Sequence, residues 1–511
     1  MIPFSITLVL DIGPQSVNLQ RSISQTTEIV NMKRYLVAVM CSMVTFCFYC
    51  MRLNLNIAIV EMIKTKNSTE CDNINGTVTT ETSRSKEFDT EIPTYAWDEE
   101  TRQMILSSFY YGYTVTAFPG GWLACRVGGK PIIFCILILS SILTALIPWS
   151  AGVSSDLLIV LRVLDGMVQG LNKSALVVIL GKWTVPHERS ILVTIAFFGF
   201  TFSQVICNPI SAWICSYKFG GWPLSFYIYS TLTIVTAIIW VFLIYETPDE
   251  DPFISSDEVE YLKRFDTEVE KKNKKISVPL LSIAQSSAVW AVVIVDAVDN
   301  FGFFFIITEA PTFVTEILGF DLEATGWITS SLGIVSCCFV LLSGACADFF
   351  IRREYLSILQ TRKLFAVLGI GLPSFLLSCM EFFKQSAVSC LILLMLAFGI
   401  FGCTNACITP NVLDITKHYS GVLVGVMTTL ASCSAVVGPT IIGELTKYTN
   451  TFEQWSLMFK IVSGVMLFGL TIFLIFAKAE EQFPLNEHFS KQEMKSYRTI
   501  QSTSDEVLNT E

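Results

Sequence analysis

Long apolar runs recur from one end of this chain to the other, and they constrain its fold more than any other feature. Stretches of about 20 residues with few or no charges repeat along the sequence, which is the length a helix needs to cross the hydrocarbon layer of a membrane. Only 15% of the 511 residues are charged, whereas soluble domains have about 25%. These values argue against a water-soluble fold, and we expect an all-α, multi-pass membrane protein.

The apolar runs predict twelve transmembrane helices in two six-helix bundles. The first six runs span residues 35–61, 103–124, 131–151, 157–180, 190–215 and 223–245. The second six span residues 288–310, 325–347, 364–383, 388–410, 420–443 and 457–477. The chain is thereby divided into an N-terminal tail (1–33), a bundle (34–246), a linker (247–286), a second bundle (287–478) and a C-terminal tail (479–511).

Lysine and arginine are concentrated in alternate loops, which predicts the orientation of the chain. The basic set comprises Lys33, Arg34, Arg126, Lys130, Lys182, Arg189, Arg352, Arg353, Arg362, Lys363 and Lys478. Cytoplasmic loops carry such an excess, so we expect both termini and the linker in the cytoplasm. The long first loop, 63–100, has glycosylation sequons at Asn67 and Asn75, and we expect it on the outer or luminal side.

Charge and cysteine content exclude several other classes. The formal net charge is -10, but much of the acid lies in loop 63–100 and in the C-terminal tail, and we expect no nucleic-acid partner. The sixteen cysteines are scattered through apolar runs without metal-ligand spacing, so we interpret them as small buried hydrophobes and expect no metal site. No nucleophile–base pair stands out. We therefore expect neither an enzyme nor a resident cofactor, and we assign no catalytic residue.

A faint internal repeat supports two related halves. Gly-Trp-Leu-Ala-Cys-Arg follows the second run at 121–126, and Gly-Ala-Cys-Ala-Asp-Phe follows the eighth at 344–349. Basic residues come after each segment. The equivalent positions suggest duplicated six-helix halves, an arrangement that many alternating-access transporters have.

Ionisable residues stand inside several predicted spans, where a charge costs about 2.5 to 3.5 kcal/mol. They are Arg52 in the first span, Arg162, Asp165 and Lys173 in the fourth, Asp296 and Asp299 in the seventh, and Asp414 in the tenth. In a chain of two repeats these four spans are equivalent helices. Charges at such positions usually face a protein cavity.

The fourth span carries one polar stripe. Arg162, Gly166, Gln169 and Lys173 fall at i, i+4, i+7 and i+11. A cavity with excess positive charge would attract a small anion, and the planar guanidinium of arginine suits a carboxylate or phosphate. Two alternatives stay open: Arg162 and Asp165 neutralise each other, or Lys173 and the seventh-span aspartates do.

Several ordered segments resemble one known family. The first span reads Arg-Leu-Asn-Leu-Asn-Ile-Ala at 52–58, and later segments read Ser-Ser-Phe-Tyr-Tyr-Gly-Tyr at 107–113, Pro-Gly-Gly at 119–121, Gly-Trp-Pro at 221–223 and Asn-Phe-Gly-Phe at 300–303. To about residue 480 the chain resembles solute carrier family 17, the anion transporters of the major facilitator superfamily, and in particular their inorganic phosphate cotransporter group. The resemblance implies two six-helix bundles, rocker-switch alternating access and organic or inorganic anion substrates.

The resemblance also implies roles for individual residues. Arg52 and Arg162 are expected to coordinate the anion, with Gln169, Lys173 and Asn300 as further substrate-binding residues. The expected gating and motif residues are Gly121, Arg126, Gly129, Lys130, Glu188, Arg189 and Asp348. We expect a monomeric transport unit in the bilayer, and we favour the plasma membrane over a vesicle or lysosome.

Departures from the family pattern refine this expectation. Gln169 stands where vesicular glutamate and sialic acid carriers have a proton-coupling Glu, and it matches the sodium-phosphate and organic-anion branch. Our first hypothesis is therefore sodium-coupled symport of inorganic phosphate or a small organic anion, with Asp296 and Asp299 as ion-coupling candidates. Alternatives are a proton-coupled vesicular or lysosomal carrier of acidic sugars or amino acids, or a receptor-like member that no longer transports. Further departures are Cys125, where a motif Asp is usual, and Lys173, where an aromatic residue is common.

Overall fold

The computed structural model describes residues 33–63, 93–215, 220–264, 280–320, 322–416, 419–446 and 451–483. Within these ranges the chain is helical apart from connecting turns and one isolated bridge between Ile63 and Tyr95. Both sequons, Asn67 and Asn75, lie outside the described residues, as does most of each predicted tail.

The first half contains the spans predicted for the N-terminal bundle. Its helices are α2 (Lys33–Met62), α3 (Glu99–Val127), α4 (Gly129–Val153), α5 (Ser155–Gln169), α6 (Asn172–Trp183), α7 (Arg189–Cys215) and α8 (Gly221–Leu243). Helices α5 and α6 together form one span, which is interrupted at Gly170 and Leu171. Local sequence explains several helix starts: Asp98 accepts from the backbone N–H of Thr101 at the start of α3, and Ser154 does the same for Leu157 in α5.

The linker and the second half follow the same pattern. The linker contains η2 (Pro248–Glu250), α9 (Ser256–Arg264) and α10 (Leu280–Gln285). The second half begins with α11 (Ser287–Thr312), η3 (Phe313–Ile317) and α12 (Leu322–Arg352). It continues with α13 (Ile358–Ala366), η4 (Val367–Gly371), α14 (Leu372–Ser378) and η5 (Cys379–Phe383), which form one span. The last spans are α15 (Ala387–Phe401) with η6 (Gly402–Ala406) and α16 (Ile408–Ile415), then α17 (Ser420–Thr446) and α18 (Phe452–Phe476).

Ten spans among the described residues are long and apolar enough to cross a membrane. The other two predicted spans correspond to α3 and α17, which pack against each other between the two halves. Helix α3 also packs on α5, so much of its surface meets protein rather than lipid. This position explains why a helix that carries several serines, threonines and glycines is tolerated in the bundle.

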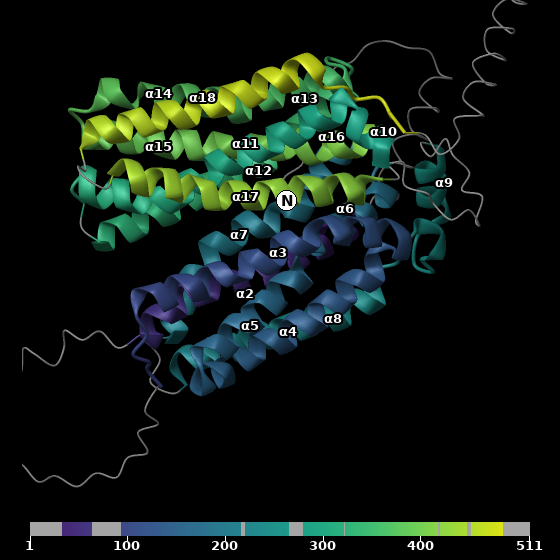
Figure 1. Ribbon diagram of the computed structural model, residues 1–511. Coiled ribbons are helices and arrows are strands. Elements are labelled where there is room, and N and C mark those ends of the chain that lie inside the picture. The colour runs from purple at the N-terminus through teal and green to yellow at the C-terminus, as the bar shows by residue number, and fades with distance from the viewer. Residues whose placement is uncertain are drawn as a thin grey trace, which may run out of the picture.

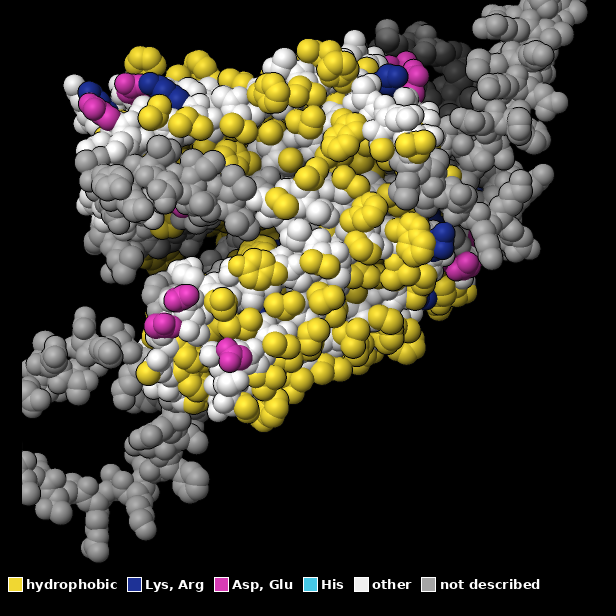
Figure 2. Space-filling view, viewed as in Figure 1, with side chains coloured by type: hydrophobic (Ala, Val, Ile, Leu, Met, Phe, Trp, Pro, Cys, Tyr) yellow, Lys and Arg dark blue, Asp and Glu magenta, His cyan; other side chains and the backbone are white. Residues whose placement is uncertain are grey.

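The two halves lie one above the other in Figure 1, with α9 and α10 at one end. The N-terminal parts of α2, α4, α7 and α13, which contain Arg34, Lys130, Arg189 and Arg362, lie at this end, which we call the basic end. The opposite end, where loop 63–100 begins, we call the loop end. Apolar side chains are spread over the visible outer surface of both halves in Figure 2, and the visible Lys, Arg, Asp and Glu side chains lie mainly at the two ends, as expected for contact with lipid tails. Trp213 and Phe242, for example, are two large apolar side chains that are each 69% exposed.

Candidate functional site

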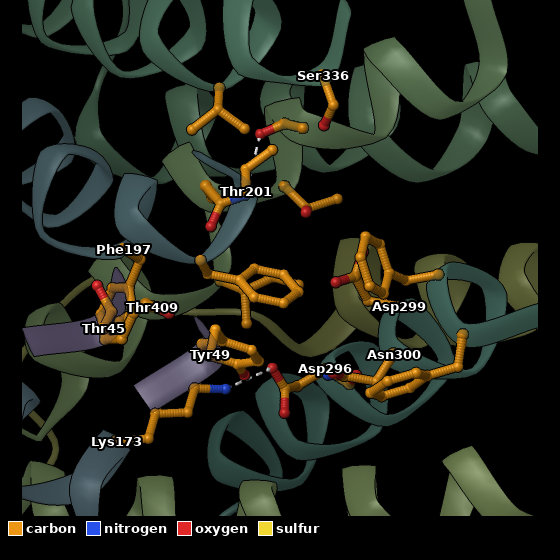
Figure 3. A pocket seen from close by; sticks show the side chains of 18 of the residues that line it. Thr45, Tyr49, Lys173, Phe197, Thr201, Asp296, Asp299, Asn300, Ser336 and Thr409 are labelled. Carbon is orange, nitrogen blue, oxygen red and sulfur yellow. Dashed lines mark hydrogen bonds and ion pairs between the residues drawn. The ribbon is translucent and has the colours of Figure 1, made fainter. Parts of the chain in front are cut away.

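A cavity of about 140 Å³ lies between the two halves. Polar and charged side chains come to it from both sides, and aromatic rings fill much of the remaining wall (Figure 3). The first half contributes Arg52, Gln169, Asn172 and Lys173, among others, and the second contributes Asp296, Asp299, Asn300, Thr404 and Asn405. The cavity therefore brings together residues from the first, fourth, seventh and tenth spans, the four that the sequence marks with buried charges.

Two of these spans are broken where they meet the cavity. The fourth span changes from α5 to α6 at Gly170, and the tenth passes through the 3-10 turn η6, which contributes Gly402, Thr404 and Asn405 to the wall. The hydroxyl of Thr116 in α3 donates to the carbonyl of Met167 at 2.8 Å, beside the first break. Interrupted helices at equivalent places in two halves are typical of transporter binding sites, because irregular backbone is tolerated in a membrane only inside protein or along a cavity.

Arg52 enters the cavity within a group of aromatic rings. Its guanidinium carbon lies 4.3 Å from the ring centre of Phe109, 4.8 Å from Tyr49 and 4.9 Å from Tyr113. Ring faces attract a cation without satisfying its N–H groups. Within the described ranges, Nε of Arg52 is buried and has no hydrogen-bond partner. The aromatic group therefore stabilises the cation while its Nε–H stays available.

An ion pair connects the two halves across the cavity. Nζ of Lys173 in α6 lies 3.6 Å from Oδ1 of Asp296 in α11, and the two side chains point toward each other in Figure 3. In the part of the chain that the structure describes, Oδ2 of Asp296 and Oδ1 of Asp299 have no hydrogen-bond partner. Asn300 donates to the backbone carbonyl of Asp296 at 2.7 Å and holds the helix there.

Arg162 occupies a different position from Arg52. It is 2% exposed, lies 5.0 Å from the ring of Phe109, and is not among the side chains that line the cavity. Its NH1 is 3.8 Å from Oδ2 of Asp165. Ser140 and Gln169 both donate to the carboxylate of Asp165. Arg162 thus contacts the same Phe109 ring as Arg52 but does not line the cavity. Its predicted role toward an anion stays a prediction.

Comparisons with known proteins agree with this architecture. The sequence model described as Major Facilitator Superfamily matches residues 41–439. Human sialin is 31% identical over 457 residues, covering 89% of this chain and 91% of sialin. Vesicular glutamate transporter 3 of Danio rerio is 32% identical over 454 residues, covering 88% of this chain and 74% of that protein. The mouse sodium-dependent phosphate transport protein 3 is 30% identical over 462 residues, with 88% and 94% covered.

The chain belongs to solute carrier family 17, within the major facilitator superfamily. Solved structures support the fold at lower identity. The proton:xylose symporter XylE, bound to 6-bromo-6-deoxy-D-glucose, has a TM-score of 0.63 at 12% identity over 89% of this chain and 97% of its own. The human organic anion transporter MFSD10 has a TM-score of 0.60 at 14% identity, with 86% and 99% covered. The family and the fold exclude an enzyme, as the sequence predicted.

In this family 17 transporter, polar contacts join the halves at the basic end. The carboxylate of Asp348 in the second half accepts from the backbone N–H groups of Ser190 and Ile191, at 3.1 and 2.7 Å. These groups begin α7 and have no acceptor within that helix. Asp414 lies between Arg189 and Arg362, at 2.6 and 2.8 Å. The second half thereby supplies the two carboxylates that pair with the N–H groups and with Arg189 at the start of α7 in the first half.

Glu188 makes a second connection between the halves. Its carboxylate lies 2.8 Å from NH2 of Arg34 and 2.7 Å from NH2 of Arg352. The backbone N–H of Arg34 also donates to Glu258 of α9 at 3.2 Å. Glu258 lies outside the spans, and its burial raises the pKa of this carboxyl group above its ordinary value. The linker helix is therefore attached to the same network that closes the basic end.

The other predicted motif residues lie at the basic end of the first half. Glu246 accepts from the backbone N–H groups of Gly129 and Lys130, at 3.1 and 2.8 Å, and its Oε1 lies 2.8 Å from Nζ of Lys182. An acid at the start of α4 complements the positive end of the helix dipole. The guanidinium of Arg126 stacks 3.9 Å from the Trp122 ring centre.

Among the described side chains, helices α3 and α17 meet without a comparable charge. Cys125 occupies the first-half position that corresponds to Asp348, and its sulfur packs against Gly421 near the start of α17. A β-carbon on Gly121 would lie 2.1 Å from the carbonyl oxygen of Gly421. Small residues allow this close backbone contact. The α3–α17 contact is therefore steric, whereas the contact of Asp348 with α7 is polar.

Several site residues escaped the sequence analysis. Asn172 lies in the cavity wall, and within the described residues its buried Oδ1 has no partner. Thr404 and Asn405 lie in the turn of the tenth span. The available signal was a glycine at related places in two equivalent spans, Gly170 and Gly402, each beside uncharged polar residues. Such a pair of glycines marks an interrupted helix, and thereby the cavity wall.

Proposed function

We propose that this chain is a secondary active transporter that moves a small organic anion by alternating access, with sodium as the coupling ion. The observation that supports it most directly is the cavity between two halves, in which Arg52 and Lys173 present cationic groups. Gln169 and Asn300 add polar groups to the same wall. We propose a monomeric transport unit.

The lining of the cavity favours an organic anion over inorganic phosphate. Eight lining residues are aromatic: Phe48, Tyr49, Tyr113, Phe197, Phe200, Phe303, Phe304 and Phe401. Aromatic walls stabilise the apolar body of an organic ligand but give little to a small, strongly hydrated ion. Asp296 and Asp299 would also repel a multiply charged anion. The named substrates of the relatives, glutamate and phosphate, leave both classes open for this chain.

The charges of the cavity favour a coupling cation. Among the described residues, its lining contains two cations, Arg52 and Lys173, and two acids, Asp296 and Asp299. An added anion leaves one excess negative charge, which a monovalent cation would neutralise. The amide of Gln169 does not gain or lose a proton near neutral pH, so Gln169 cannot serve as a carrier of a coupling proton. We assign the coupling role to Asp296 and Asp299. A relative named as sodium-dependent supports sodium as the coupling ion.

The conformation supports alternating access. The halves are joined at the basic end by Asp348, Glu188 and Asp414, and Figure 2 shows a hollow between them toward the loop end. We propose that the basic end, with both termini, faces the cytoplasm, and that Asn67 and Asn75 are glycosylated outside. The structure is then the outward-facing conformation. We propose the plasma membrane as its location.

Uptake into liposomes that contain the purified protein tests this function. Labelled urate, glutamate, sialic acid and phosphate are offered with an inward sodium gradient, with a pH gradient in sodium-free buffer, and with neither. We expect sodium-driven uptake of at least one organic anion, and its loss in Arg52→Ala. Lys182→Gln, which removes a lysine outside the cavity, serves as the control.

Each outcome separates the alternatives. Uptake driven by the pH gradient without sodium would replace sodium coupling by proton coupling. Uptake of phosphate alone would overturn the organic-anion assignment. No uptake of any of the four anions under any gradient, by protein that is folded and correctly inserted, would favour a receptor-like member.

A further inference from the structure

We infer that Lys173 links anion binding to cation binding. In the absence of an anion, Lys173 forms an ion pair with Asp296. A bound anion competes for Lys173, and the carboxylate of Asp296 is then free to bind the cation. This inference rests on the proposed function and adds to it the residue through which the two ligands are coupled. Asp296 and Asp299 alone would account for a cation site but not for its coupling to the anion. Lys173 explains why the cation binds together with the anion.

The geometry of the pair permits this exchange. The 3.6 Å between Nζ of Lys173 and Oδ1 of Asp296 is longer than a hydrogen bond, so the two groups attract each other without being locked in one arrangement. The lysine side chain is 25% exposed and the aspartate side chain 5% exposed. The lysine is therefore the partner that an incoming ligand can reach, and the aspartate is the one that stays buried.

An anion would compete directly for Lys173. The first half presents Arg52 and Lys173 to the same cavity, and a ligand carboxylate between them would satisfy both cations. Lysine moves its compact charge easily on a flexible stem. When Nζ turns to the ligand, Asp296 loses the ion pair that neutralises it, and a buried charge without a partner is strongly unfavourable.

The cavity that Asp296 lines also contains oxygen atoms that could bind a cation. Considering only described residues, Oδ2 of Asp296 already has no hydrogen-bond partner, and Asp296 is 3% exposed. Asp299 is three residues further on α11, so both carboxylates lie on one helix face. Oε1 of Gln169 and Oδ1 of Asn172 also belong to cavity-lining side chains and lack partners in the described chain. Carboxylate and carbonyl oxygens beside broken helices are the groups that coordinate sodium in transporters.

The pair also connects the two bodies that move during transport. Lys173 belongs to α6 and Asp296 to α11, so the attraction extends from one half to the other. A ligand that separates the pair removes a contact that holds the halves in this arrangement. An anion without a cation would leave Asp296 charged and unpartnered, which opposes movement with only one ligand bound. The exchange therefore supplies the thermodynamic link that symport needs.

Sodium binding without any substrate tests the inference. The full-length protein is purified in detergent, and its thermal unfolding is followed while sodium chloride replaces choline chloride at constant ionic strength. Removing the lysine charge in Lys173→Gln should mimic the anion-bound state. We expect half-maximal stabilisation at a sodium concentration about tenfold lower than in the wild type, within the range of known coupling factors. Lys173→Met repeats the test with an apolar chain, in case the Gln variant does not fold.

Three further variants define the result. Lys173→Arg keeps the charge and should behave as the wild type. Asp296→Asn should abolish the sodium effect, alone and together with Lys173→Gln. Lys182→Gln, which breaks an ion pair at the basic end, should leave the sodium dependence unchanged.

Two outcomes overturn the inference, and they differ. Equal sodium dependence in the wild type and in both uncharged Lys173 variants would remove Lys173 as the link while leaving a sodium site in place. No stabilisation by sodium in any variant would overturn both the exchange and the proposed sodium coupling.

Discussion

Replacing Gly121 by alanine should open the basic end of this transporter. A β-carbon at Gly121 would lie 2.1 Å from the carbonyl oxygen of Gly421, about 1.2 Å closer than a short C···O contact of about 3.3 Å. The obstructing atoms belong to the backbone of α17, so no side chain can move aside. The clash exists only while α3 and α17 are in contact, and separation of the halves removes it.

The size of the effect follows from this clash. Overpacking in protein interiors costs about 1 to 3 kcal/mol, which corresponds to a shift of about 5- to 150-fold in the equilibrium between the closed and open basic end. Alanine also favours the helix by about 1 kcal/mol relative to glycine. That gain is present in both conformations, so it cancels in the equilibrium. Gly464→Ala in α18 is the matched control, because no atom of the described residues lies within 4 Å of its added β-carbon.

Hydrogen exchange measures the shift in the native chain without labels. The backbone N–H groups of Ser190 and Ile191 donate to Asp348 of the other half, so their protection depends on closure of the basic end. In Gly121→Ala we expect exchange in the peptide that contains them to accelerate about 5- to 150-fold. Gly464→Ala should leave it unchanged. A folded Gly121→Ala protein with wild-type exchange at these amides would refute the steric closure of α3 on α17.

Three other predictions concern the site and the orientation. Arg52→Lys keeps the charge but loses the guanidinium that contacts the rings of the cavity. We expect expression to stay normal and uptake into liposomes to fall about tenfold or more. Uptake equal to that of the wild type would contradict the role of Arg52 in anion binding. Arg162→Ala should impair uptake, and the double change Arg162→Ala with Asp165→Ala should not restore it; rescue in the same assay would show that Arg162 only neutralises Asp165. Changing Asn67 and Asn75 to Gln should shift a glycosylated band to lower apparent mass on a gel. A glycosylated band that does not shift would contradict the outer or luminal position of loop 63–100.

Closure of the basic end uses different interactions in the two halves. Asp348 neutralises the start of α7 through its carboxylate, whereas Cys125 meets the start of α17 with a sulfur atom. Thiols are weak hydrogen-bond acceptors. The α3–α17 contact therefore depends on the glycines at 121, 421 and 425, whose added β-carbons would all meet backbone atoms across the interface. This asymmetry is why a single methyl group at Gly121 is expected to have a large effect.

The sequence alone determined the spans, the two halves and the buried charges. These properties depend on local composition, because a run of apolar residues of sufficient length must cross the membrane as a helix whatever its neighbours are. Arg52, Lys173, Asp296 and Asp299 could be selected for the same reason: a charge in such a run needs a cavity. The resemblance to family 17 added the residues at the basic end.

Only the tertiary structure decided which charges face each other. The polar stripe on the fourth span places Arg162 and Lys173 on one face of a continuous helix, but α5 ends at Gln169 and α6 begins at Asn172. Lys173 lines the cavity, whereas Arg162 lies outside the lining, beside Phe109 and Asp165. Helical periodicity defines a face only while the helix continues. The direction in which that face points is set by packing between helices far apart in the sequence. Helices α6 and α11 both pack against α17, and Lys173 and Asp296 meet across the cavity.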